Sequence, residues 1–286
     1  MKALIVGLGL IGGSIAKSLK KYSEWTVIGC DKDDSTVNEA LRLGVIDGTW
    51  YCDTSSDADI CIICLSPDSC ISFLNDYAHL LKKDSVVTDV CGVKTNIVDS
   101  CERICIENGL HFIGGHPMAG RERNGFKNSD ENLFNRASYI LTKTDNTSKK
   151  AVDMASSLAT AINCARITIT TPENHDKVIA FTSQIPHILA GAYVKSPTCK
   201  QRHGFSAGSF KDVSRVATVD ENLWSELFLL NKNQLIPEID SLINSLNAYK
   251  TAIENNDEDK LKDIIKQGRV IKENDIRETE KGENNA

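Results

Sequence analysis

The sequence has no long hydrophobic run and no excess of positive charge. Its longest apolar stretch, residues 58–65, is interrupted by Asp59 and is far too short to cross a bilayer. Lys and Arg number 33 against 39 Asp and Glu, a net charge of −6, so nucleic acid is not an expected partner. The amino terminus lacks the basic stretch and cleavage site of a signal peptide. We therefore expect a globular cytoplasmic protein that binds neither membrane nor nucleic acid.

The ten cysteines show no regular framework of pairs. In a reducing cytosol such thiols are mostly small buried apolar residues. Cys61 and Cys64 match a CxxC pattern, but they lie in an apolar run typical of a strand, where they face opposite sides. Since no second pair follows and no other cluster has metal-ligand spacing, we expect no metal site.

Strand and helix signals alternate through the first 170 residues. Strands are predicted at 2–6, 25–30, 59–65, 85–89, 111–114, 138–142 and 166–170, with helical segments between most of them. This alternation predicts a parallel sheet with helices on both faces. Thr171, Pro172 and Glu173 have the pattern of a helix start. After them the sequence shows helical signals and no strand signal. We therefore expect an α/β domain over 1–170 and an all-α domain over 171–286, with helices at 222–247 and 257–274 and a loose tail after Glu278.

A glycine-rich segment directly follows the first predicted strand. It has the GxGxxG spacing and consists of Gly7, Leu8, Gly9, Leu10, Ile11 and Gly12. The first glycine permits a tight turn, the second lets a pyrophosphate approach the backbone, and the third lets helix and strand pack closely. Asp31 ends the second strand, where a carboxylate binds a ribose 2′-hydroxyl and repels a 2′-phosphate, so we predict NAD rather than NADP. Lys32 can soften that choice, and the alternative is a glycine-rich turn with an exposed aspartate.

Two further segments lie at predicted carboxyl ends of strands, the edge where ligands bind in such folds. Ser66 and Pro67 follow the strand at 59–65; they either contact the nicotinamide half or only begin a helix. His116 follows the strand at 111–114. A histidine with its usual pKa of about 6.5 can accept the proton of an alcohol whose hydride is being removed. From chemistry alone, a loop histidine held by its neighbours is an equal alternative.

Three longer motifs carry a resemblance that spans about residues 1 to 270. They are His116-Pro117-Met118-Ala119-Gly120 with Glu122, Gly125 and Phe126; His175-Asp176 through Ser183-Gln184-Ile185-Pro186-His187; and Phe210-Lys211-Asp212-Val213-Ser214-Arg215. In these segments the chain resembles the prephenate dehydrogenases, a tyrosine-biosynthesis family that includes arogenate and cyclohexadienyl dehydrogenases. The resemblance implies a Rossmann-type dinucleotide-binding domain followed by an all-α dimerisation domain, and a homodimer. It also implies NAD-dependent oxidative decarboxylation of prephenate to 4-hydroxyphenylpyruvate.

The resemblance also implies roles for single residues. His116 would be the catalytic histidine, Arg215 would bind a substrate carboxylate, in some members from the partner subunit, and Ser183 and His187 would line the substrate pocket. Gly92 stands where many members have a serine that supports the substrate hydroxyl, so a backbone N–H or a water would take over that contact in this chain. Arg121 adds a cation where smaller polar residues also occur.

Three alternatives remain open. The first is an arogenate dehydrogenase, whose substrate carries an ammonium in place of the keto group of prephenate. Gln184 is neutral and stands where a histidine is common, which favours prephenate. Another Rossmann-plus-helical dehydrogenase and a non-catalytic NAD sensor are the other two. By the resemblance, we expect neither a fused chorismate mutase nor an ACT domain.

Several residues have plainer interpretations from the sequence alone. His175 and Asp176 fit a helix cap, Lys94 a solvated side chain, and Trp224 packing within the helical domain. Pro186 is expected to kink its helix and turn His187 toward the cleft.

Overall fold

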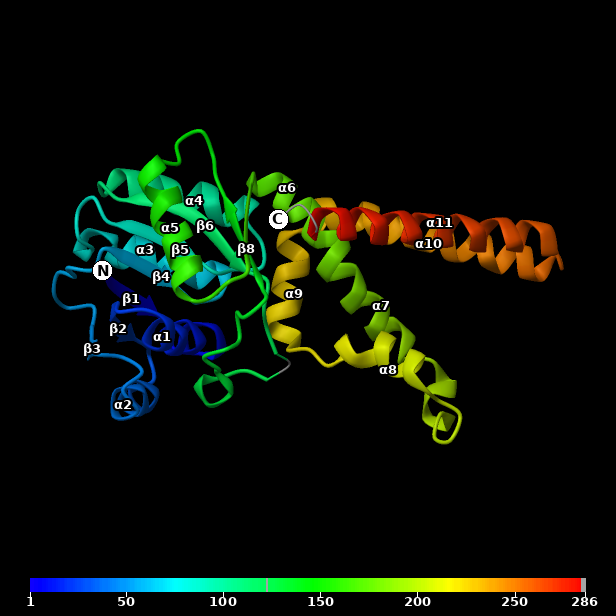
Figure 1. The fold of residues 1–286 in the computed structure, drawn as a ribbon, viewed down its shortest axis with the longest axis horizontal. Helices are drawn as coiled ribbons and strands as arrows, with labels where there is room; N and C mark the ends of the chain where they lie inside the picture. Colours follow the sequence, from blue (N-terminus) through cyan, green and yellow to red (C-terminus); the bar gives the residue numbers. More distant parts are fainter. Residues whose placement is uncertain (122, 284–286) are drawn as a thin grey trace. The chain divides into compact units, whose positions relative to one another are not determined.

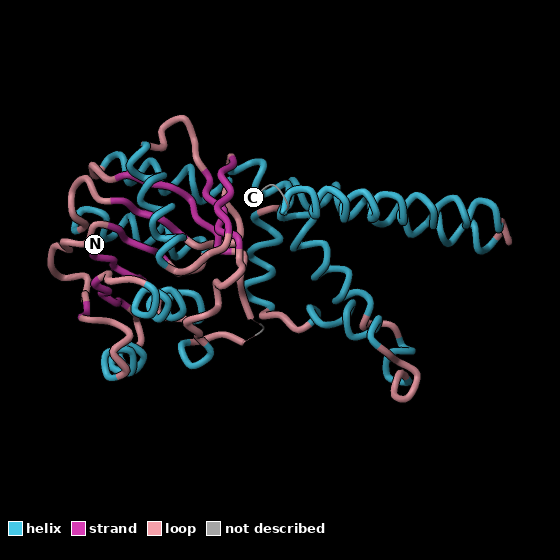
Figure 2. Tube along the Cα trace, viewed as in Figure 1, coloured by secondary structure: helices cyan, strands magenta, loops and turns pink. Residues whose placement is uncertain are grey.

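The structure is a computed structural model that describes residues 1–121 and 123–283. Glu122, which was noted above with the motif His116 to Gly120, therefore lies outside the described residues. The amino-terminal part is an eight-stranded sheet, which Figure 2 shows in magenta. Its strands are β1 (Lys2–Val6), β2 (Thr26–Cys30), β3 (Gly48–Thr49), β4 (Ile60–Ile63), β5 (Val86–Asp89), β6 (His111–Pro117), β7 (Ser138–Thr142) and β8 (Arg166–Thr170).

The spatial order of the strands is β3-β2-β1-β4-β5-β6-β7-β8. The first six strands are parallel and have the order typical of dinucleotide-binding folds. The order reverses between β1 and β4, so the ends of these two strands form the switch point where ligands bind.

Alternate residues of the strands face two separate cores, as the period of two in a strand requires. Ala3 and Ile5 of β1 pack in one core, and Leu4 and Val6 pack in the other. Helices α1 (Leu10–Tyr22), α2 (Asp34–Arg42) and α5 (Lys149–Ala161) cover the first face, and α3 (Pro67–Tyr77) and α4 (Thr95–Glu107) the second (Figure 1). Both faces are buried, which explains the nearly continuous apolar run of β4.

The expected all-parallel sheet is wrong at one pair, because β6 and β7 are antiparallel. The described residues of the segment between them contain a short 3₁₀ turn, Phe126–Asn128, and no crossover helix. A parallel connection needs such a crossover, so β7 returns beside β6 in the opposite direction. All seven predicted strands are present; the two-residue β3 was missed because it is too short to show periodicity.

Beyond Thr170 the described residues contain helices and no strand. The elements are α6 (Pro172–Ile179), a π-helical turn (Ala180–Gln184), α7 (Ile185–Tyr193), a 3₁₀ helix (Pro197–Gln201), α8 (Gly208–Ser214), a 3₁₀ turn (Arg215–Ala217), α9 (Glu221–Leu230), α10 (Lys232–Glu254) and α11 (Glu258–Glu283). None of the described helices has the length and apolar character needed to cross a membrane.

Two expectations for this half are wrong. The single helix expected at 222–247 is divided into α9 and α10 at Asn231. The Asn231 side chain donates to the Asp176 carbonyl and to Gln184 Oε1, and these two hydrogen bonds hold the break in place. The tail expected after Glu278 is helical to Glu283. Ion pairs between residues three or four apart, as between Arg269 and Glu273, support α11 before this point.

The chain divides into two compact units, residues 1–232 and residues 233–286. The second unit holds most of α10 and all of the described part of α11. The sheet and the cavity described below both lie in the first unit.

Candidate active site

The glycine-rich turn lies at the switch point, between the ends of β1 and β4. Gly7 has φ +90°, and a Cβ there would stand 2.6 Å from the Cys64 carbonyl oxygen. A Cβ on Gly12 would stand 1.8 Å from the Gly7 carbonyl oxygen. Both positions therefore need glycine for the turn itself. Gly9 differs, because a Cβ there would meet nothing within 4 Å.

The start of α1 is suited to a phosphate group. Gly9 is the N-cap and supplies no side-chain hydrogen bond, so the first N–H groups of α1 have no cap from that residue. These groups and the positive end of the helix dipole bind anions. The open space over Gly9 lets a pyrophosphate reach them, so this turn fits a dinucleotide.

Asp31 and Lys32 follow the end of the neighbouring strand β2. The Leu8 N–H donates to Asp31 Oδ2 at 2.7 Å, and the Asp33 N–H donates to Oδ1 at 2.9 Å. The carboxylate is thus held against the glycine-rich turn, at the position expected for a ribose partner. Lys32 is exposed.

Ser66 and Pro67 lie at the carboxyl end of β4. Ser66 is the N-cap of α3 and Pro67 is in its first turn. The Ser66 hydroxyl donates to Ser69 Oγ at 2.9 Å rather than capping the helix backbone. The helix start is therefore present, and both residues lie at the same sheet edge as the glycine-rich turn.

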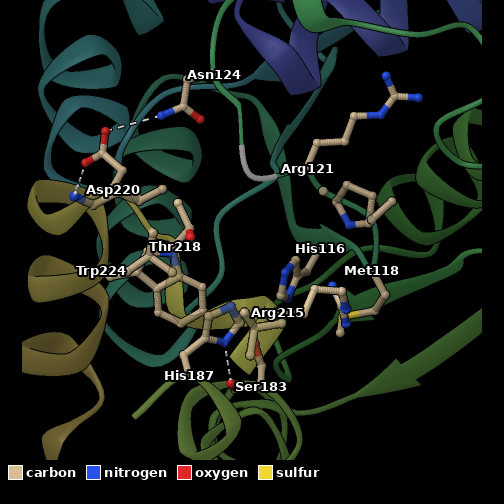
Figure 3. A pocket seen from close by; sticks show the side chains of 16 residues that line it. His116, Met118, Arg121, Asn124, Ser183, His187, Arg215, Thr218, Asp220 and Trp224 are labelled. Carbon is tan, nitrogen blue, oxygen red and sulfur yellow. Dashed lines mark hydrogen bonds between the residues drawn. The ribbon is translucent and has the colours of Figure 1, made fainter. Parts of the chain in front are cut away.

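A cavity of about 370 Å³ opens beside the end of β6 (Figure 3). This volume is within the range typical of small-molecule sites. It is lined by five of the six residues expected in the substrate and catalytic site: His116, Arg121, Ser183, His187 and Arg215. The sixth, Gly92, is not among the lining residues, and a Cβ there would touch Leu227 at 3.5 Å.

His116 makes a hydrogen bond that the sequence did not indicate. Its Nδ1 lies 2.9 Å from Nε2 of His175, and Nδ1 of His175 lies 2.8 Å from Oδ1 of Asp176. His175 and Asp176 are buried, whereas His116 is partly buried and reaches the cavity. Burial, the neighbouring His175 and the charge of Lys94 hold the pKa of His116 well below its usual value of 6.5. His116 is therefore a neutral imidazole at neutral pH.

Asp176 does act as a cap, but on α4 rather than on its own helix. Its carboxylate accepts the N–H groups of Lys94 and Thr95, each at 2.8 Å, and the Thr95 hydroxyl at 2.6 Å. Burial favours its neutral form, but the hydrogen bonds from His175 and Thr95 outweigh burial and lower the pKa of Asp176. The expectation of a local helix cap at His175 and Asp176 is therefore wrong, because α4 and α6 meet at these residues.

Lys94 is fully buried, so the expectation of a solvated side chain is also wrong. Its ammonium forms an ion pair with Asp89 and donates to the Cys91 carbonyl at 2.8 Å. The other oxygen of Asp89 accepts the Gly115 N–H at 3.2 Å. The buried pair thus ties the start of α4 to the backbone next to His116.

His187 and Trp224 form the opposite side of the cavity. Their rings stack with centroids 3.7 Å apart, and His187 Nδ1 donates to the Ser183 carbonyl at 2.8 Å. Trp224 packs within the helical part of the chain as expected, also against Phe228, and it lines the cavity as well. His187 faces the cavity as expected, although a π-helical turn precedes Pro186, which lies in the first turn of α7.

Two residues are engaged elsewhere. The Arg121 side chain extends away from His116 in Figure 3, and its guanidinium pairs with Asp130. Gln184 is buried outside the cavity, where it donates to the Leu227 carbonyl at 3.2 Å and accepts from Asn231 at 2.8 Å. The preference for prephenate inferred from Gln184 therefore has no structural basis. Among the described residues no cluster could hold a metal ion.

Comparison with known proteins identifies the family. Residues 15–168 match the family described as prephenate dehydrogenase, nucleotide-binding domain, and residues 171–267 match prephenate dehydrogenase, dimerization domain. The chain belongs to the prephenate dehydrogenase family. The resemblance drawn from the motifs is thereby confirmed, as is a nucleotide-binding α/β fold followed by a helical dimerisation domain.

Three relatives illustrate the match. The prephenate dehydrogenase of Bacillus subtilis (strain 168) is 33% identical over 270 residues, which are 90% of this chain and 71% of that protein. The structure of A. aeolicus prephenate dehydrogenase in complex with hydroxyphenyl propionate and NAD+ has a TM-score of 0.82 at 29% identity, covering 96% and 98% of the two chains. Synechocystis arogenate dehydrogenase has a TM-score of 0.81 at 27% identity, covering 96% and 99%.

Proposed function

We propose that the protein catalyses the NAD-dependent oxidative decarboxylation of prephenate to 4-hydroxyphenylpyruvate. The observation that carries this proposal is one cavity that contains both His116 and Arg215. A proton acceptor at one side and a guanidinium at another match a substrate with a ring hydroxyl and carboxylates. The relatives named prephenate dehydrogenase support the same activity.

The glycine-rich turn and its surroundings would hold the cofactor. The backbone from Gly7 to Gly12 would bind the pyrophosphate, Asp31 the adenosine ribose, and Ser66 and Pro67 would lie near the nicotinamide half. When bound, NAD accepts the hydride from the ring carbon that carries the hydroxyl. Lys32, beside Asp31, is the residue that would allow some use of NADP.

The residues of the cavity would then manage protons and charge. Neutral His116 takes the hydroxyl proton as the hydride leaves, and the bond to the ring carboxylate breaks to release CO₂. The ring becomes aromatic, and the proton on His116 returns to the phenolic oxygen, so one prephenate and one NAD give 4-hydroxyphenylpyruvate, CO₂ and NADH. Arg215 would hold a carboxylate with its two parallel N–H donors, while Ser183 and His187 contact the rest of the substrate. Arg121 can approach the substrate only by leaving Asp130.

Arogenate is the second candidate, and Asp220 is the observation that favours it. This carboxylate lines the cavity and could attract the ammonium of arogenate. However, its oxygens already accept the N–H groups of Asn222 and Leu223 and the amide of Asn124, at 3.1, 3.0 and 3.2 Å. An ammonium would have to compete with these donors, so we propose prephenate as the preferred substrate.

The proposal also includes a domain boundary, an oligomeric state and a cellular location. We place the boundary between the dinucleotide-binding and helical domains at 170/171, between the end of β8 and the start of α6. We propose a homodimer because residues 171–267 match a dimerisation domain. We also propose a cytoplasmic location, since all ten cysteines are free thiols, as a reducing compartment would keep them.

The test is to mix the purified protein with NAD and either prephenate or arogenate and to follow NADH absorbance. We expect the wild type to oxidise prephenate with a higher kcat/KM than arogenate. We expect His116→Asn to oxidise neither substrate and still to bind NAD. Asp220→Asn keeps a good helix cap and should leave that preference unchanged. A wild-type protein that binds NAD but oxidises neither substrate would contradict the proposed function, and a strong preference for arogenate would contradict the choice of substrate.

A further inference from the structure

The carboxylate of Asp176 fixes the positions of protons in the site. It accepts four hydrogen bonds, from the backbone N–H groups of Lys94 and Thr95, from the Thr95 hydroxyl and from His175 Nδ1. A carboxylate that is held ionised can only accept, so His175 Nδ1 must carry a proton.

The same reasoning extends from His175 to His116. Burial lowers the pKa of His175 below its usual value of 6.5, so its imidazole is neutral at neutral pH and Nε2 has a lone pair. The hydrogen bond of 2.9 Å between Nε2 of His175 and Nδ1 of His116 therefore needs a proton on His116 Nδ1. The remaining nitrogen of His116, Nε2, is then unprotonated. In a neutral histidine the partner of one nitrogen decides which nitrogen is the base.

We propose that His175 is a positioning residue that holds His116 as the Nδ1–H tautomer, so that Nε2 is the atom that accepts the substrate proton. His175 takes its own orientation from Asp176, which is in turn fixed at the amino end of α4. The inference rests on the proposed function only for its catalytic consequence, because the tautomer of His116 is a property of the protein without substrate.

The charged and titratable groups around His116 and His175 come from several elements of the chain. From β5 and the start of α4 come Asp89 and Lys94, which form their own buried ion pair; from α6 comes Asp176, and the cavity adds Arg121, Asp220, His187 and Arg215. Asp176 is the carboxylate that touches His175, and His175 is the group that touches His116. The contacts therefore form one chain, in which His116 at the cavity donates to His175, and His175 donates to Asp176 at the start of α4.

Two substitutions separate the two nitrogens of His175. In His175→Gln the side-chain oxygen can reach the place of Nε2 and still accept from His116, whereas the contact to Asp176 is lost. In His175→Asn the amide can reach the place of Nδ1 and still donate to Asp176, whereas the contact to His116 is lost. His111→Gln is the matched control, because His111 is on β6, the strand that carries His116, and like His175 it contacts a carboxylate, Asp84, at 2.8 Å.

The first readout is the ¹⁵N chemical shifts of labelled histidines in the wild type, with His116 assigned by comparison with His116→Asn. We expect a protonated Nδ1 and an unprotonated Nε2 on His116, the same tautomer in His175→Gln and in His111→Gln, and loss of it in His175→Asn. This measurement needs no turnover, so it stays informative if the proposed reaction is wrong. A wild-type His116 protonated on Nε2 would overturn the inference, whether or not the variants fold.

The second readout is kinetic. We expect kcat to fall roughly 100-fold in His175→Asn and clearly less in His175→Gln, with KM for NAD unchanged in both and no change in His111→Gln. Equal losses in the Gln and Asn variants would contradict a positioning role and would indicate that His175 only stabilises the fold.

Discussion

At the scale of single residues, burial decides which side chains of this site are charged. His116 and His175 are neutral because burial lowers both pKa values, whereas Asp176 stays ionised because four donors surround it. Lys94 is buried with Asp89 as its counter-ion, and this pair anchors Gly115 beside His116. The neutral form of His116, which the proposed proton transfer needs, is thus maintained by groups that do not line the cavity.

The lowered pKa of His116 predicts where activity is lost in acid. The proposed reaction needs neutral His116, and a group with a lowered pKa becomes protonated only at lower pH. We therefore expect kcat/KM for prephenate to hold from pH 8 down through about 6.5, the usual histidine pKa, and to fall only below it. The measurement is kcat/KM across buffers of constant ionic strength, with recovery at pH 7.5 as the control for unfolding. An acid limb centred at or above 6.5 would contradict this assignment.

Arg215 gives a prediction about binding rather than proton transfer. Arg215→Ala removes the planar fork that would grip a substrate carboxylate, so KM for prephenate should rise roughly 10- to 100-fold. KM for NAD should not change, because Arg215 lines the substrate cavity and not the glycine-rich turn. Steady-state kinetics with each substrate varied separately test this. The control is Arg166→Ala, which changes an exposed arginine on β8. An unchanged KM for prephenate in Arg215→Ala would show that Arg215 does not bind the substrate.

These residue-level features differ in how well the sequence predicts them. His116, His187 and Arg215 were found because they lie in specific motifs, and the structure brings them to one cavity. The buried Lys94 and the contact between His116 and His175 could not be found, because their partners become neighbours only when β5, β6, α4 and α6 pack together. The sequence shows which residue types are present, but not which of them meet.

At the scale of elements, the glycines of the glycine-rich turn are needed for different reasons. Gly12 is needed for the fold, because a Cβ there would collide with the turn, whereas the space next to Gly9 is open and is available to the cofactor. The same spacing motif therefore contains two glycines whose substitution should have different consequences.

This difference gives a paired prediction. Gly9→Ala has room for its methyl group and a negative φ of −71°, so thermal stability should be nearly unchanged while Kd for NAD rises roughly tenfold or more, because the methyl blocks the pyrophosphate. Gly12→Ala collides with the Gly7 carbonyl, so both Tm and NAD affinity should fall. Thermal unfolding and calorimetric titration with NAD measure the two effects. Loss of stability in Gly9→Ala, or normal NAD binding in that variant, would contradict this division of roles.

The elements also show where periodicity stops being informative. It placed seven strands correctly, since a buried strand differs clearly from an amphipathic helix in its pattern. It could not give the direction of β7, which depends on whether the connection from β6 contains a crossover helix. It also joined α9 to α10, because the break at Asn231 depends on hydrogen bonds to residues 47 and 55 positions earlier in the chain.

At the scale of the whole molecule, the second compact unit carries apolar side chains that a single chain leaves exposed. On α10 and α11 these are Ile236, Ile243, Leu246, Tyr249, Ile253, Ile265, Val270, Ile271 and Ile276. Positions 236, 243, 246 and 253 follow the spacing of one helix face. A row of exposed apolar side chains along one helix face is typical of an interface between proteins.

The proposed homodimer predicts that this face is buried between two copies. The wild type should sediment at twice the chain mass of 31.4 kDa, and Leu246→Glu, which places a charge on the apolar face, should shift it toward the monomer. The control is Asn244→Glu, two positions away and therefore on the opposite side of α10, which adds the same charge and should leave the mass unchanged. Sedimentation velocity at several protein concentrations distinguishes the two variants. A monomeric wild type, or a Leu246→Glu variant with the wild-type mass, would show that this face is not the dimer interface.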